Sequence, residues 1–98
     1  MTGLDGLEPW LRPSAEWLVR QSPGVRVTSV YRSYSDQLAL WLNRSRNPYP
    51  VAPPGRSWHQ YRRAFDLSAS DAELRRLGSL WQQMGGTWSE SDPIHFQA

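Results

Sequence analysis

The 98-residue sequence predicts an α+β domain in which about three helices pack against a small antiparallel sheet. Two observations carry this prediction. Segments with apolar residues at helical spacing alternate along the chain with short runs that are rich in β-branched or apolar residues. No apolar run approaches the ~18 residues that a membrane-spanning helix needs. We therefore expect one domain over residues 1–98.

The first helical segment is Leu7–Gln21, whose apolar residues recur on one face. Pro9 suits a first helical turn, whereas Pro13 interrupts the pattern. One long helix, and a turn followed by a helix that restarts at Ser14, are therefore equally compatible with the sequence. Ser22-Pro23-Gly24 ends the segment.

Two further helices carry recognisable N-terminal signals. The residues Ser33 to Asp36 can cap a helix that continues through Gln37–Asn43. The residues Ser70 to Glu73 match the capping box of a third helix, and Leu and Trp residues continue its apolar stripe. Gly85-Gly86 ends this third helix.

Four short segments predict strands. Val25–Val30 alternates and is rich in β-branched residues. Ala64–Ser68 is mostly apolar, which is typical of a strand that is buried on both faces. Thr87–Ser89 and Ile94–Gln97 would pair as a hairpin that turns through Glu90–Pro93.

The stretch Arg44–Arg56 contains four prolines and one glycine and has no periodicity, so we expect a loop. A loop of this length in so small a domain is usually functional or mobile. It leads directly into Ser57 and His59. We therefore expect it to form one wall of a site.

The composition limits the possible classes of function. The chain has no cysteine, which excludes disulfides and thiolate metal sites. Its net charge of +2 is too small to indicate nucleic-acid binding. The N-terminal MTGLDGLEPW has neither a basic n-region nor an apolar h-region, so no signal peptide is visible in this chain. We expect a monomer without a nucleic-acid or membrane partner.

The strongest functional signal is an acidic residue among apolar neighbours. Asp66 lies within Ala64–Leu67, where an ionised carboxylate costs several kcal/mol unless a positive group pairs with it. The chain has two histidines, His59 and His95, and both lie near segments of buried character. Two imidazoles and one carboxylate are the protein ligands of a catalytic zinc ion, whose fourth position is left for water. The sequence therefore predicts a Zn²⁺ site formed by His59, Asp66 and His95.

Other residues near these ligands suggest hydrolytic chemistry. Asp92 precedes Pro93, and a turn there would bring its carboxylate beside the metal, in the position of a general base. Arg32 follows a strand that we expect beside the Asp66 strand. It could hold an oxyanion or a substrate carboxylate, or it could simply pair with Asp36. Three aromatic residues could line the cleft: Trp58, Tyr61 and Trp88.

Three motifs give the sequence a family resemblance. They are Ser29–Tyr34 with Gln37, Ser57-x-His59 with Ala64-x-Asp66, and Gly86-Thr87-Trp88 with Asp92–Gln97. In this order they resemble the zinc D-alanyl-D-alanine carboxypeptidase family of peptidoglycan hydrolases, which includes the L-alanyl-D-glutamate endopeptidases of phage endolysins. The resemblance implies a hedgehog/D-Ala-D-Ala-peptidase-like fold, with a single zinc peptidase domain over residues 1–98 and a motif-bearing part at 25–97.

The resemblance also implies an activity. The chain would be a zinc metallopeptidase that hydrolyses a stem-peptide bond involving a D-amino acid, as an endopeptidase or as a D,D-carboxypeptidase. It would act on the cell wall in a periplasmic, extracellular or phage-associated setting. An Asp at the base position and the closing His-Phe-Gln favour the endolysin branch.

The same resemblance implies roles for individual residues. His59, Asp66 and His95 would be the zinc ligands, Asp92 would be the catalytic base, and Arg32 would stabilise the substrate or the transition state. Ser57 would bind substrate or support the loop around His59. Three further candidates for substrate binding are Gln37, Trp58 and Trp88.

Two positions depart from the family pattern. Arg62 stands where the family usually has Gly, and Val30 replaces the Gly before Tyr-Arg. If the family Gly has a positive φ, Arg62 would cost roughly 1 kcal/mol and shift the loop. These departures and the small size keep a second hypothesis open, a catalytically degenerate module that binds the cell wall or a partner protein through the same groove.

Overall fold

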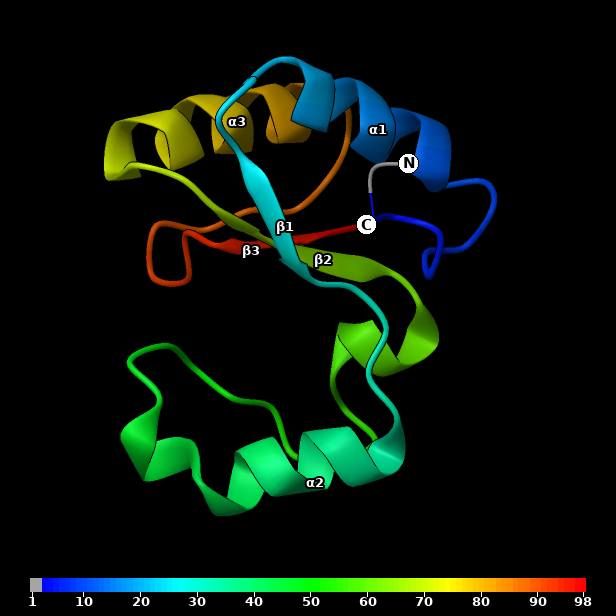
Figure 1. Cartoon of the computed structure of the whole chain (residues 1–98), viewed down its shortest axis with the longest axis vertical. Coiled ribbons are helices and arrows are strands. Elements are labelled where there is room, and N and C mark those ends of the chain that lie inside the picture. Colours follow the sequence, from blue (N-terminus) through cyan, green and yellow to red (C-terminus); the bar gives the residue numbers. More distant parts are fainter. Residues whose placement is uncertain (1–2) are drawn as a thin grey trace.

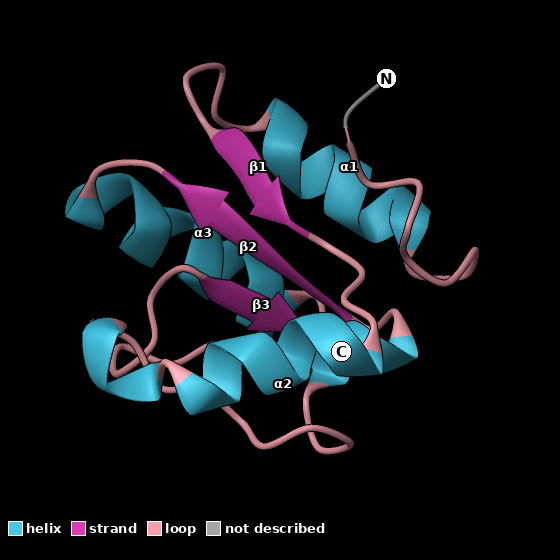
Figure 2. Ribbon diagram, turned by 60° about the horizontal axis from the view of Figure 1, so that its bottom comes forward, coloured by secondary structure: helices cyan, strands magenta, loops and turns pink. Residues whose placement is uncertain are grey.

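The computed structural model describes residues 3–98, in which a three-stranded antiparallel sheet lies between two helical layers. In chain order the elements are α1 (Arg12–Arg20), β1 (Arg26–Ser29), α2 (Tyr34–Leu42), η1 (Arg44–Arg46), η2 (Trp58–Tyr61), β2 (Ala64–Ser68), α3 (Asp71–Gln83) and β3 (His95–Gln97). Helices α1 and α3 cover one face of the sheet, and α2 lies on the opposite side (Figures 1 and 2). The predicted α+β class is confirmed.

The sheet has the order β1-β2-β3, so the predicted Asp66 strand is central. Asp66 is paired with His95 on one side and with Ser29 on the other. A register shift between Val27 and Ser29 interrupts the β1 ladder, and Thr28 Oγ1 there donates to the Asp66 carbonyl at 3.3 Å. Strand pairing therefore places two segments beside the Asp66 side chain: the residues that follow β1, and His95 at the start of β3.

Alternation along β2 separates the core from the site. Phe65 and Leu67 join the apolar cluster that also takes residues from α1 and α3. Phe65 stacks on Phe96 with ring centroids 5.4 Å apart and meets Trp81 edge-on at 5.2 Å. Asp66 points to the opposite face, toward α2. The first four residues of β2 are all buried, as predicted for a strand covered on both sides.

Helix α1 begins at Arg12 and places Pro13 in its first turn. Proline suits this position because the first N–H groups of a helix have no partner within the helix. The structure therefore favours the turn followed by a helix over the long helix from Leu7. Leu7 and Leu11 still belong to the apolar core, although they precede the helix.

The two predicted helix caps have different outcomes. At α2, Ser33 Oγ accepts from the Asp36 N–H at 3.1 Å and the Asp36 carboxylate accepts from the Ser33 N–H at 3.4 Å, which completes a capping box. At α3, Ser70 Oγ accepts from the Glu73 N–H at 3.2 Å. The Glu73 carboxylate instead accepts from Arg76 and, at 2.7 Å, from Ser22 Oγ. The hydrogen bonds from Arg76, and then the one from Ser22, lower the pKa of Glu73 to about 2.

The predicted strand Thr87–Ser89 is reduced to a single bridge, in which Thr87 and Gln97 exchange both backbone hydrogen bonds. The reason is the packing of Trp88 against α3. A Cβ atom built on Gly78 would lie 2.2 Å from the Trp88 ring, so the indole occupies the space that a side chain would need. Trp88 Nε1 also donates to the Pro93 carbonyl at 2.9 Å.

Arg62 is the one non-glycine residue with positive φ (60°) in the described range 3–98. The position where the resemblance expects Gly therefore does have the left-handed conformation, which costs a larger residue about 1 kcal/mol. The Arg62 side chain offsets part of this cost. Its guanidinium lies 4.1 Å from the centre of the Tyr31 ring and donates to the Gly6 carbonyl at 3.2 Å.

The longest helix, α3, has 13 residues. Among the described residues, no helix combines the length and the apolar character required to cross a membrane.

The contact between Gly78 and Trp88 predicts the effect of a substitution. Replacing Gly by Ala inside a helix normally stabilises by about 1 kcal/mol. We expect Gly78→Ala to destabilise the protein by about 1–3 kcal/mol, because the new methyl group overlaps the indole. Urea unfolding measures this change. The control is Gly24→Ala, where no heavy atom lies within 4 Å of the added Cβ and stability should change little. Equal stability of Gly78→Ala and the parent would contradict the packing.

Candidate metal centre and active site

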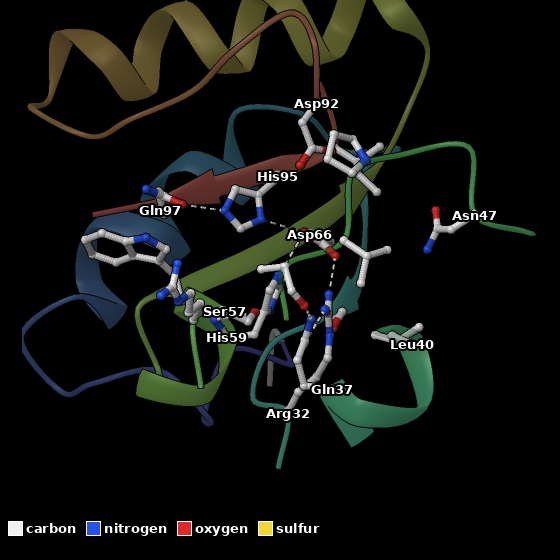
Figure 3. A pocket seen from close by; sticks show the side chains of 17 residues that line it. Arg32, Gln37, Leu40, Asn47, Ser57, His59, Asp66, Asp92, His95 and Gln97 are labelled. Atoms are coloured by element: carbon white, nitrogen blue, oxygen red, sulfur yellow. Dashed lines mark hydrogen bonds and ion pairs between the residues drawn. The ribbon is translucent and has the colours of Figure 1, made fainter. Parts of the chain in front are cut away.

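Three predicted ligands converge on the side of β2 that faces away from the core. His59 Nε2 lies 3.1 Å and His95 Nδ1 lies 3.3 Å from the same oxygen, Asp66 Oδ1. The three donor atoms lie within 4.8 Å of one another (Figure 3). A tetrahedral zinc ion with bonds of about 2.0–2.1 Å separates neighbouring ligand atoms by roughly 3.3 Å. The two oxygen–nitrogen distances match this separation, and the two imidazole nitrogens, which lie within 4.8 Å of each other, would move closer together around a single metal ion.

Each of these side chains is placed by a different element. His59 belongs to η2, whose N-cap Ser57 accepts from the His59 N–H at 3.3 Å. Asp66 is in the central strand, and His95 is its cross-strand partner at the start of β3. Ser57 thus supports the backbone at His59, and it also lines the cleft, so both roles predicted for it remain compatible with its position.

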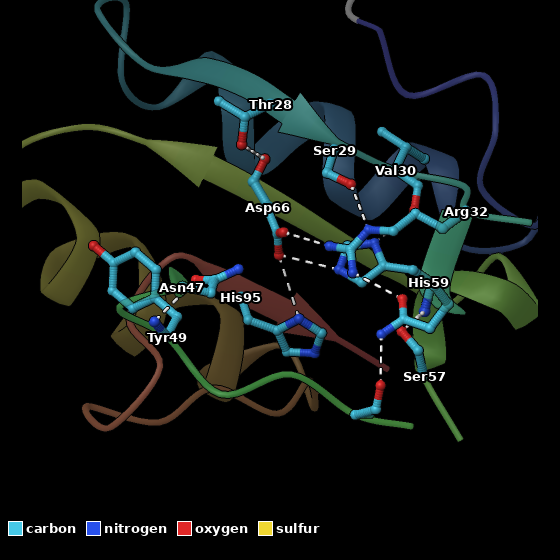
Figure 4. A network of polar contacts seen from close by, with 12 residues as sticks. Thr28, Ser29, Val30, Arg32, Asn47, Tyr49, Ser57, His59, Asp66 and His95 are labelled. Carbon is cyan, nitrogen blue, oxygen red and sulfur yellow. Dashed lines mark hydrogen bonds and ion pairs between the residues drawn. The ribbon is translucent and has the colours of Figure 1, made fainter. Parts of the chain in front are cut away.

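The hydrogen bonds of the two imidazoles show why a cation fits between them and Asp66. His59 Nδ1 lies 2.6 Å from the Val30 carbonyl oxygen, which only accepts, so Nδ1 carries a proton, and in the neutral ring Nε2 directs a lone pair at Asp66 (Figure 4). His95 Nε2 lies 2.6 Å from Gln97 Oε1, which in the neutral ring leaves the Nδ1 lone pair facing Asp66. Two lone pairs directed at one carboxylate oxygen repel it unless a metal ion or a ring proton lies between. In metal-binding histidines, the ring nitrogen that does not bind the metal typically donates a hydrogen bond to such an oxygen.

Gln97 received no role from the sequence, although a signal was present. It stands two residues after His95, so the alternation of a strand puts both side chains on one face. The hydrogen bond between Gln97 Oε1 and His95 Nε2 orients the His95 ring.

The second oxygen of Asp66 is held by Arg32. Arg32 Nη2 donates to Asp66 Oδ2 at 2.9 Å, Nη1 donates to Gln37 Oε1 at 3.0 Å, and Nε donates to Ser29 Oγ at 3.0 Å. Asp36, the other partner considered, caps α2 instead. With three directions of its guanidinium engaged, Arg32 has the geometry of a positioning residue for Asp66.

Gln37 connects this network to the proline-rich loop. Its side chain is 1% exposed, and its Nε2 donates to the Ala52 carbonyl at 2.7 Å. Gln37 therefore reaches the metal site through Arg32 and fixes the loop at the same time.

An open cleft of about 450 Å³ lies over the three donors. The predicted loop Arg44–Arg56 forms one of its walls, through Asn47, Pro50–Ala52 and Arg56. Trp58 also lines the cleft, and it is 39% exposed.

Two other aromatic residues lie elsewhere. Trp88 packs on Gly78 of α3 and lines a separate hollow beside Arg75, so the prediction that it borders the cleft was wrong. Tyr61 is also absent from the lining of the cleft, and its hydroxyl donates to the Gly55 carbonyl.

Asp92 lines the cleft without belonging to the group of three donors. The His95 N–H donates to the Asp92 carbonyl at 3.1 Å, which closes the predicted turn and brings Asp92 beside His95 (Figure 3). Burial raises the pKa of the Asp92 carboxyl, and the charge of Asp66 adds to this effect while that of His95 opposes it.

The other pKa values reflect the same crowding. Burial opposes ionisation of Asp66, but hydrogen bonds from His59 and His95 and the charge of Arg32 hold the pKa of this carboxyl well below its usual range. Burial alone would lower the pKa of His95, yet its hydrogen bonds to Asp66 and Gln97 raise it above the ordinary value.

No protein-family model and no curated protein sequence matches the chain. Solved structures do match it. The LdcB LD-carboxypeptidase superposes with a TM-score of 0.72 at 20% identity over 95% of this chain and 65% of its own. The zinc complex of the D,D-pentapeptidase VanY from a VanB-type resistance cassette has a TM-score of 0.68 at 18% identity over 93% and 71%. The L-Ala D-Glu endopeptidase ChiX of Serratia marcescens has a TM-score of 0.65 at 20% identity over 99% and 87%.

The chain shares the fold of these peptidases. The fold implied by the three sequence motifs is therefore confirmed. The chain spans slightly less than two thirds of the length of LdcB and most of the length of ChiX.

The protonation of His95 predicts how zinc binding depends on pH. Because the pKa of His95 without a metal is raised above its ordinary value, the ring proton competes with the metal up to a higher pH than it would on a free imidazole. Zinc affinity should be constant above this raised pKa and should fall by about tenfold per pH unit below it, since one proton is displaced. Competition with a chromophoric chelator between pH 5.5 and 8.5 measures the change. An affinity independent of pH over this whole window would contradict the prediction.

Proposed function

We propose that the chain is a zinc-dependent peptidase that hydrolyses a peptidoglycan stem-peptide bond involving a D-amino acid. The observation that carries the proposal is the convergence of His59 Nε2, Asp66 Oδ1 and His95 Nδ1 in a cleft that also contains Asp92. The shared fold supports it, because VanY was solved with Zn(II) and LdcB and ChiX are named for a carboxypeptidase and an endopeptidase activity. Its place of action would be the cell wall, in a periplasmic, extracellular or phage-associated setting.

The three donors would hold the zinc ion in the cleft, where all three are lining residues. When bound, zinc would supply a Lewis acid that activates water and polarises the scissile carbonyl. Arg32 would keep the Asp66 carboxylate in its orientation through the bond to Oδ2.

Asp92 is our candidate for the general base. It lines the same cleft, and burial raises its pKa, which brings a carboxyl group closer to the range where it exchanges protons in catalysis. As a carboxylate it would accept a proton from the attacking water. It would then donate that proton to the leaving nitrogen as the C–N bond breaks, so that a free amine departs and Asp92 returns to its starting state.

Substrate contacts would come from residues around these groups. The Ser57 hydroxyl accepts from the His59 backbone, and because Ser57 lines the cleft, its O–H would be available as a donor to substrate. The exposed ring of Trp58 would pack against the peptide. Gln37 would act indirectly, through its hydrogen bond with Arg32. Trp88 is not proposed to contact substrate, because its ring packs against Gly78.

The role of Asp92 predicts a variant that separates catalysis from metal binding. Asp92→Asn should lower the rate of muropeptide hydrolysis by at least about 10²-fold, because the amide cannot accept the proton. Its zinc content and melting temperature should match those of the parent, since Asp92 is outside the group of three donors. The control is Asp5→Asn, an exposed carboxylate on the N-terminal segment, which should retain full activity. Undiminished hydrolysis by Asp92→Asn would remove the general-base assignment.

The digestion products identify the reaction within this class. Mass spectrometry of zinc-loaded protein with purified muropeptides would show free D-Ala for a D,D-carboxypeptidase and split stems for an L-alanyl-D-glutamate endopeptidase. Chelation of the metal should stop either reaction. Muropeptide binding without any turnover would instead support the degenerate wall-binding module, and hydrolysis that persists in metal-depleted protein would contradict a zinc peptidase.

A further inference from the structure

The cleft contains a second arginine, Arg56, whose side chain is not engaged by the protein. Arg56 lines the cleft and is exposed. Over the described residues 3–98, its guanidinium takes part in none of the side-chain hydrogen bonds or ion pairs, whereas Arg32 uses three directions for Asp66, Gln37 and Ser29. The cleft therefore has one cation committed to the metal site and one available to a ligand.

The backbone that carries Arg56 is fixed to the element that carries His59. The Gly55 N–H donates to Gln60 Oε1 at 2.7 Å, and the Gly55 carbonyl accepts from the Tyr61 hydroxyl. The Arg56 N–H donates to the Pro53 carbonyl at 3.0 Å. Gln60 and Tyr61 both belong to η2. This end of the proline-rich loop is thus attached to the metal site, and the guanidinium starts from a defined point on the cleft wall.

The position of Arg56 defines one end of the cleft. Figure 3 shows Ser57 on one side of Asp66 and Leu40 and Asn47 on the other side. Arg56 directly precedes Ser57, so its Cα lies about 3.8 Å from that of Ser57, at the same end. A substrate that spans the metal site would therefore contact the Arg56 guanidinium at the end of the cleft near η2 and the Leu40 side chain at the opposite end.

We propose that Arg56 binds a free carboxylate on the leaving residue of the substrate and so selects stem peptides in which this group is not amidated. The proposal deepens the proposed function and rests on it. In a carboxypeptidase reaction, the leaving residue carries the C-terminal carboxylate. In cleavage before D-Glu, that diacid uses one carboxyl group for the chain and keeps the other free. Both reactions thus present the same anion, which a guanidinium binds in bidentate geometry.

The test compares acid and amide forms of the substrate. Two pairs of synthetic stem peptides serve as probes: one with a C-terminal D-Ala carboxylate or carboxamide, the other with D-Glu or D-isoglutamine. Zinc-loaded parent should prefer the acid form of the cleaved pair by roughly ten- to a hundred-fold in kcat/KM, the range of a charge-assisted hydrogen bond. Which pair shows the preference identifies the source of the carboxylate.

Two variants and a control assign this preference to Arg56. Arg56→Gln should reduce the preference to near one by raising KM for the acid form, with the amide form cleaved at the parental rate. Arg56→Lys should restore part of the preference, because the charge is kept while the planar fork is lost. Arg20→Gln removes an exposed arginine at the end of α1 and should leave the preference unchanged.

The outcomes separate this proposal from the one on which it rests. An unchanged acid preference in Arg56→Gln, or no preference in the parent, would overturn the role of Arg56 while leaving the peptidase assignment intact. If the zinc-loaded parent cleaves none of the peptides, the proposed activity fails. Calorimetric titration with the same pairs then decides on Arg56, because acid-selective binding that Arg56→Gln loses supports it and equal binding of acid and amide overturns it.

Discussion

The site depends on the neutralisation of one carboxylate in the centre of a small sheet. Asp66 is 7% exposed, and an isolated ionised group at that depth would cost several kcal/mol. Both oxygens of Asp66 have partners that offset this cost: Oδ1 faces the two imidazoles, and Oδ2 accepts from Arg32. Because His59 and His95 both direct ring nitrogens at the same oxygen, the arrangement needs a positive charge at that point. A ring proton or a metal ion can provide it.

The core on the other face of β2 holds this arrangement in place. Phe65 and Phe96 are cross-strand partners, and the next pair along the strands is Asp66 with His95. The stacking of Phe65 on Phe96 and their contacts with Trp81 therefore fix the register that sets the distance between ligands. A slip of one residue would exchange the two faces and move the carboxylate into the core.

Much of this architecture could be predicted from the sequence, because its signals are local. The strand Ala64–Ser68 has the predicted bounds, and the Ser33 cap forms as expected. The failures concern partners that are distant in the sequence. Nothing in the local pattern shows that the Trp88 ring fills the space left by Gly78, or that the Glu73 carboxylate accepts from Ser22 instead of completing its own capping box. The engagement of Arg32 by Asp66 likewise depends on strand pairing.

In the proposed site, a single zinc ion would be held by two imidazoles and one carboxylate from three separate elements. X-ray absorption spectroscopy at the zinc edge of the purified, zinc-loaded protein tests it most directly. We expect nitrogen and oxygen donors at about 2.0–2.1 Å from the zinc, with outer-shell scattering from two imidazole rings. A shell without imidazole scattering, or with a single ring, would contradict it.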